Sequence, residues 1–176
     1  MFPDDLLNMA EGLATGAVSH RRGRPRRSDL SRAVSSIYYA LFHTLAAYGS
    51  DLLVGRTKDL RSEPAWRQAY RALEHGKARN QCRRKEYIAK FPGAVEDFAT
   101  LFVHMQRLRH LADYDPDTSF SRSEVLQWLD DSRDALHDLS RVPHKDLRAF
   151  AVYLLLPMRE RVAVPSPALR SRSGLT

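Results

Sequence analysis

The chain is 176 residues long, with 43% hydrophobic and 28% charged residues, a balance typical of one soluble domain with a substantial core. Its longest apolar run, from Phe150 to Leu156, is too short to cross a bilayer, and no stretch has the form of a signal peptide. A single cysteine, Cys82, excludes an internal disulfide and suits a reducing compartment. We therefore expect a cytoplasmic protein without a membrane segment.

Apolar residues recur every three or four positions in the first half of the chain, which predicts helices and almost no strand. A first helix is expected over 4–15. Ser28 is the expected N-cap of a long second helix to about Gly49, which buries an apolar stripe of Leu30, Val34, Ile37, Leu41, Leu45 and Tyr48. A third helix is expected to begin near Pro64 and to break around Gly76.

The second half of the chain predicts three more helices. Pro92-Gly93 marks the start of a fourth, which should end at Asp115 because Pro116 disfavours helical geometry in the residue before it. Ser121 and Glu124 form a capping-box pair that opens a fifth, and an amphipathic sixth covers 144–156. The fold prediction is an all-α, up-and-down bundle of four to five core helices plus a short extra C-terminal helix. We expect one domain over 1–160 and a disordered tail over 161–176.

The chain is strongly basic, with a formal charge of +7 and an isoelectric point near 9.8. Such a surface attracts polyanions, above all nucleic acids. A second interpretation stays open, because 23 of the 28 basic residues are arginine, a bias that GC-rich coding DNA produces without any ligand. One basic loop contains Arg22-Gly-Arg-Pro25, which resembles the core of an AT-hook that lies in a DNA minor groove. That resemblance makes Arg22, Arg24, Arg26 and Arg27 candidate DNA-binding residues.

The predicted second helix has a polar face as well as its apolar stripe. Arg32, Ser36, Tyr39 and His43 follow at steps of four, three and four, so they form one seam. This seam indicates a central helix that lines a cleft. The alternative is that the tyrosine and histidine are half-buried with one hydrogen bond each, and that the arginine is simply solvated.

The end of the predicted fourth helix carries the side chains best suited to catalysis or ligand binding. Helical spacing puts Arg109 over Asp113 and His110 over Tyr114. These residues form either a polar clasp at a helix end or a small site for phosphate chemistry. Cleavage of RNA by its own 2′-hydroxyl needs a base, an acid and a cation, and Arg109, His110 and Tyr114 include such groups.

The sequence contains no pattern typical of other kinds of functional site. There is no Glu-x-x-His motif, His104 and His110 face different ways on a helix, and one cysteine cannot build a thiolate zinc site. No glycine-rich phosphate loop and no Gly-x-Ser-x-Gly motif occur. We therefore expect neither a metal nor an organic cofactor.

Two segments, 30–43 and 107–115, resemble the HEPN superfamily of bacterial and archaeal helical domains, and 72–80 is similar in character. The resemblance covers about residues 28–140. It implies a four- to five-helix bundle, a homodimer with facing sites, and in many members a metal-independent ribonuclease of toxin or defence type. It also implies a possible nucleotidyltransferase-like or antitoxin partner. The family motif is an arginine, usually a polar residue next, and a histidine four to six residues after the arginine.

Arg109 and His110 match the first two motif positions, but Tyr114 stands where the histidine is expected, and 111–116 contain no histidine. Tyrosine is a poor base at neutral pH. Either His110 or His43 supplies the proton transfer, or this member has lost cleavage; relatives with an Arg-x4-Tyr form include toxin-like proteins.

Three functions are therefore predicted, in order of preference. The first is RNA binding or metal-independent RNA cleavage by a homodimer, with Arg109 on the phosphate, His110 and Tyr114 as proton-transfer or ribose contacts, and Asp113 as the orienting carboxylate. The second is a non-catalytic module that binds a protein partner or a nucleotide. The third is DNA binding through the basic loop.

Overall fold

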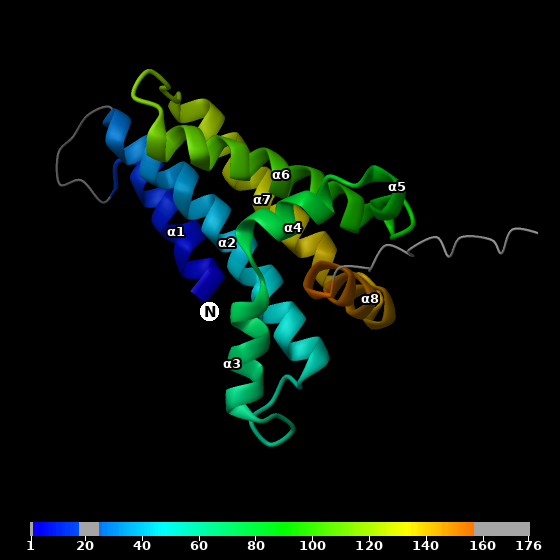
Figure 1. Ribbon diagram of the computed structural model, residues 1–176. Coiled ribbons are helices and arrows are strands. Elements are labelled where there is room, and N and C mark those ends of the chain that lie inside the picture. Colours follow the sequence, from blue (N-terminus) through cyan, green and yellow to red (C-terminus); the bar gives the residue numbers. More distant parts are fainter. Residues whose placement is uncertain (1, 18–24, 157–176) are drawn as a thin grey trace, which may run out of the picture.

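The computed structural model, which describes residues 2–17 and 25–156, is all-helical over those residues (Figure 1). It contains eight helices there and no strand, which confirms the predicted fold class. The helices are α1 (Phe2–Thr15), α2 (Arg27–Leu53), α3 (Glu63–Ala72), α4 (His75–Cys82), α5 (Lys85–Ile88), α6 (Gly93–Tyr114), α7 (Arg122–Ser140) and α8 (His144–Leu155). The tail predicted over 161–176 lies outside the described residues.

The long helices α1, α2, α6 and α7 form an up-and-down bundle, and the short helices sit at its sides (Figure 1). α2 is the centre of the fold, since α1, α3, α6, α7 and α8 all pack against it. Its 27 residues span about 40 Å. This length allows one half of α2 to pack within the four-helix bundle and the other half to pack against α3 and α8. The core is dominated by large side chains without any exposed surface, among them Ile37, Tyr38, Phe98 and Phe102.

The predicted N-cap of the second helix was wrong by two positions, since Arg26 and not Ser28 is the N-cap of α2. The carboxylate of Asp29 accepts the backbone N–H of Arg26 at 3.2 Å, which closes the first turn from inside the helix. The guanidinium of Arg27 then donates to the backbone carbonyls of Pro116 and Thr118, the latter at 2.6 Å from Nη2. These bonds tie the start of α2 to the α6–α7 loop.

The helix boundaries in the second half follow the local signals of the sequence. α6 starts at Gly93 and ends at Tyr114, with Asp115 in an extended conformation before Pro116. The Ser121 hydroxyl accepts the N–H of Glu124 at 3.2 Å, and the Glu124 carboxylate accepts the N–H of Ser121 at 2.8 Å. This capping box confirms the predicted start of α7.

The middle of the chain follows the prediction to within a few residues, since the helix expected near Pro64 begins at Glu63 and breaks shortly before Gly76. It ends at Ala72, and Leu73 adopts extended backbone angles while its side chain is buried in the core. A new helix, α4, begins at His75 and contains Gly76. No helix of the described residues is both long enough and apolar enough to cross a membrane.

Candidate functional site

The Arg109 side chain joins the end of α6 to the middle of α2. Its Nη2 donates to the phenol oxygen of Tyr39 at 2.9 Å, and its Nε lies 2.7 Å from Asp113 Oδ2. The Nε approach lies off the N–H direction, so the second contact is an ion pair rather than a hydrogen bond. Nη1 makes no hydrogen bond with any described residue, and the side chain is 23% exposed. One edge of the guanidinium therefore stays available for an anion.

Asp113 is held from two sides. Its Oδ2 faces Arg109, and its Oδ1 accepts the Ser35 hydroxyl of α2 at 2.7 Å. The prediction that Arg109 lies over Asp113 is confirmed. The arrangement has the geometry of the predicted clasp, because it links α6 to α2, and it also fixes the guanidinium in one orientation.

Tyr39 connects Arg109 to two imidazoles. Its ring centroid is 6.1 Å from that of His43 on α2 and 6.0 Å from that of His75 at the start of α4. His75 Nδ1 shares a 2.6 Å hydrogen bond with the hydroxyl of Tyr38, and His43 Nδ1 shares one of 2.6 Å with the hydroxyl of Tyr70. We call the set from α2, α4 and α6 the Arg109 cluster, namely Tyr38, Tyr39, His43, His75, Arg109 and Asp113.

Burial sets the protonation of this cluster. Desolvation lowers the pKa of His43, and it lowers that of His75 together with the positive charge of Arg109. Both imidazoles are therefore neutral at neutral pH, and each can accept a proton at Nε2 in the tautomer whose Nδ1–H donates to the neighbouring phenol oxygen. Desolvation raises the pKa of the fully buried Tyr38 well above its usual range, so this phenol stays protonated. Desolvation exceeds every other influence on Arg109, but the charge of Asp113 and the hydrogen bond to Tyr39 together raise its pKa.

The predicted polar seam of α2 is divided by the structure. Tyr39 and His43 belong to the Arg109 cluster, whereas Arg32 is exposed and lines a shallow pocket with Asp113 and Tyr114. Ser36 is only 6% exposed, and its hydroxyl donates to the carbonyl of Arg32 at 2.9 Å. Its hydroxyl proton is thus used inside the helix, and the residue faces the core rather than a cleft.

His110 and Tyr114 lie together, as their spacing predicts, with ring centroids 4.9 Å apart. His110 is exposed and Tyr114 is 67% exposed at the end of α6, and the guanidinium carbon of Arg109 lies 5.8 Å from the Tyr114 ring centroid. The structure therefore brings Arg109 and Asp113 together with α2, keeps Tyr114 in contact with the Arg109 guanidinium, and leaves His110 on the outer surface.

The basic loop is only partly described, since Arg22 and Arg24 lie outside the described residues. Arg26 and Arg27 are both exposed. The guanidinium of Arg27 donates through Nε and Nη2 to the carbonyls of the α6–α7 loop, which holds it against the protein.

Sequence reasoning missed two members of the cluster, Tyr38 and His75, and also Ser35, which donates to Asp113. His75 lies within the segment 72–80 noted above, but periodicity assigns no role to a residue at the start of an eight-residue helix. Tyr38 stands next to the predicted Tyr39, and only its hydrogen bond to a residue 37 positions away distinguishes it from an ordinary core aromatic. A pairwise signal of that kind is not present in a single sequence.

Other chemistry finds little support in the described residues. Cys82 is 5% exposed, and burial raises the pKa of its thiol to about 12, so it is no nucleophile. Over residues 2–17 and 25–156, no three His, Cys, Asp or Glu side chains lie close enough to hold a metal ion together. Compared with protein-family models, curated proteins and solved structures, the chain matches none of them. The likeness to HEPN proteins accordingly stays a prediction.

Proposed function

We propose that the protein binds RNA and cleaves it without a metal ion at the Arg109 cluster. The observation that carries the proposal is the position of Arg109, which is fixed by Tyr39 and Asp113 and keeps Nη1 available beside two neutral imidazoles. A guanidinium so placed can bind a phosphodiester and stabilise the charge that grows on it during attack.

The proposed reaction uses the 2′-hydroxyl of the RNA as nucleophile. A neutral imidazole takes the 2′-proton, the 2′-oxygen attacks phosphorus, and the bond from phosphorus to the 5′-oxygen breaks. The leaving 5′-oxygen takes a proton from solvent, which gives a 2′,3′-cyclic phosphate and a 5′-hydroxyl end. We assign proton transfer to His75, because it is exposed and stands beside Tyr39, whereas His43 is half-buried against Tyr70. Asp113 orients Arg109.

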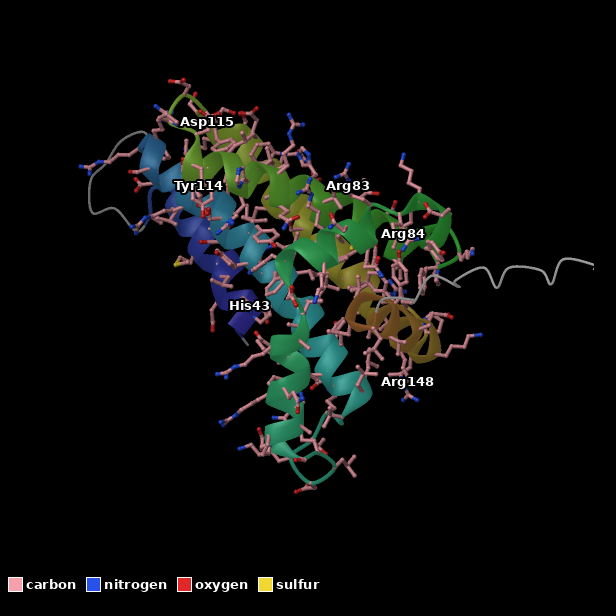
Figure 2. The ribbon with its side chains drawn as sticks, in the orientation of Figure 1. His43, Arg83, Arg84, Tyr114, Asp115 and Arg148 are labelled. Atoms are coloured by element: carbon pink, nitrogen blue, oxygen red, sulfur yellow. The ribbon has the colours of Figure 1, made fainter. Side chains whose placement is uncertain are left out.

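The test is cleavage of single-stranded RNA in the presence of EDTA. Arg109→Ala should lower the rate at least about 100-fold, as the loss of a transition-state cation does elsewhere. It should lower the free energy of unfolding by less than about 1 kcal/mol, since the ion pair is partly exposed. Arg148→Ala, which removes an exposed arginine on α8 at the other side of the molecule, is the matched control and should cleave like wild type (Figure 2).

A second candidate function is favoured by the two ties of Asp113. A residue that neutralises Arg109 and also bonds to Ser35 suits a purely structural clasp in a binding module. That module would bind a nucleotide, or a nucleotidyltransferase-like or antitoxin protein, without turnover. Absence of RNA cleavage by wild type, together with a loss of stability well above 1 kcal/mol in Arg109→Ala, would reject the ribonuclease and favour the clasp. The homodimer that the resemblance implies is tested separately by light scattering.

A further inference from the structure

A groove of about 560 Å³ runs between α4 and α6, on the outer side of the Arg109 cluster. One wall contains Arg79, which lies on α4, and Arg83, which is the C-cap residue of α4. α6 supplies the opposite wall, with His104, Arg107, Arg109 and His110 among its lining residues. In Figure 2, Arg83 stands at the edge of α4 that faces α6.

The charge of this groove has one sign. Four arginines and two histidines line it, and no carboxylate does. Within the described part of the chain, Arg79, Arg83 and Arg107 make no ion pair, in contrast to Arg61, Arg84 and Arg133. All three are exposed. Because like charges repel in the empty groove, they indicate a polyanionic ligand that neutralises them.

Aromatic rings lie along the same stretch of α6. His104 packs edge-on against Trp128 of α7, with ring centroids 6.1 Å apart. About 9 Å further along the helix axis, His110 packs against the 67% exposed Tyr114. Basic side chains beside exposed rings are the combination with which proteins hold unpaired bases and their backbone.

We propose that the α4–α6 groove binds a single-stranded nucleic acid, with Arg79, Arg83 and Arg107 on its phosphates, and that the strand leaves the groove past His110 and stacks a base on Tyr114, which lies beyond the groove lining at the end of α6. The proposal deepens the proposed function by naming the surface that holds the single strand, and it rests on that function for the chemistry at Arg109. A strand in this groove passes Arg109, which belongs to both the groove and the cluster. A duplex is the poorer fit, because its bases are stacked on each other and cannot reach the ring of Tyr114.

The test measures binding of a labelled, short single-stranded DNA of mixed sequence to the full chain by fluorescence anisotropy over a range of salt concentrations. DNA lacks the 2′-hydroxyl, so binding is measured without cleavage, and either assay can fail while the other succeeds. The groove variant is Arg79→Ala/Arg83→Ala/Arg107→Ala. Its matched control, Arg67→Ala/Arg71→Ala/Arg148→Ala, removes three exposed arginines of α3 and α8 and the same total charge.

The groove variant should bind at least roughly tenfold more weakly, and the slope of log affinity against log salt should fall by about 2, at ~0.7 for each phosphate contact. The control should keep most of the affinity and the slope. Tyr114→Ala should weaken binding roughly fivefold with an unchanged slope, because stacking is not ionic. Arg83→Glu, a single exposed change, should weaken binding in the same direction and guards against misfolding of the triple variant.

Four results would overturn the proposal. These are no binding by wild type, equal losses in the groove variant and its control, duplex DNA bound as tightly as the single strand, and competition by polyglutamate as effective per charge as that by DNA. The last result would assign the groove to an acidic polypeptide instead.

Discussion

Arginines do different work in two regions of this molecule. Where α2 begins and α6 ends, Arg27 and Arg109 direct their guanidinium groups at protein carbonyls, a phenol and a carboxylate. In the α4–α6 groove, Arg79, Arg83 and Arg107 are exposed and make no ion pair with any described residue. The first set bonds to other parts of the protein, although Arg109 also keeps Nη1 available, whereas the second set leaves its whole charge to a ligand. A net charge of +7 does not separate these two roles.

The comparison is sharpest at Arg27, where we expect the largest effect on stability. Arg27→Ala removes the bonds to the Pro116 and Thr118 carbonyls that tie the start of α2 to the α6–α7 loop. The free energy of unfolding, measured by urea denaturation, should fall by about 1–2 kcal/mol. The neighbouring Arg26→Ala is the control and should change it by less than about 0.5 kcal/mol, since this side chain is exposed. Equal effects of the two variants would contradict a structural role for Arg27.

The sequence predicted most of the fold because its boundaries depend on local chemistry. Pro92-Gly93 and Pro116 frame α6, and the Ser121–Glu124 capping box opens α7. The same local rules failed where a contact with a residue far along the chain determines where a helix begins. The N-cap of α2 moved from Ser28 to Arg26, next to Arg27, whose guanidinium binds a loop about 90 residues away.

The candidate site was predictable only in part, for the same reason. Arg109 over Asp113 and His110 over Tyr114 are contacts within one helix, so spacing alone gives them. The contacts of Arg109 with Tyr39, and of Tyr38 with His75, join helices that are far apart in the chain. Ser36 shows a different limit of prediction from spacing. Helical spacing places it in a polar seam, but its hydroxyl bonds to a carbonyl of its own helix and the residue faces the core.

The Arg109 cluster contains a histidine that should make the stability of the protein depend on pH. His75 lies against Tyr38 and near Arg109, and burial together with that positive charge lowers its pKa. Below about pH 6.5 the unfolded chain therefore takes up a proton that the folded protein resists, so stability should fall as the pH drops through this range. His75→Asn should flatten that fall when urea unfolding is measured from neutral to mildly acidic pH. An unchanged pH dependence would show that His75 is not shielded by α2.

The smallest expected effect on stability concerns Arg107, which lines the groove two residues before Arg109 on the same helix. Arg107 is exposed and makes no ion pair with any described residue, whereas Arg109 has Tyr39 and Asp113. Arg107→Ala should therefore change the free energy of unfolding by less than about 0.5 kcal/mol. The change should be a slight gain at low salt, because it relieves repulsion from Arg79 and Arg83, and it should shrink as salt screens that repulsion. A loss above about 1 kcal/mol would mean that Arg107 holds the fold together as Arg27 does, and the contrast between the two regions would then fail.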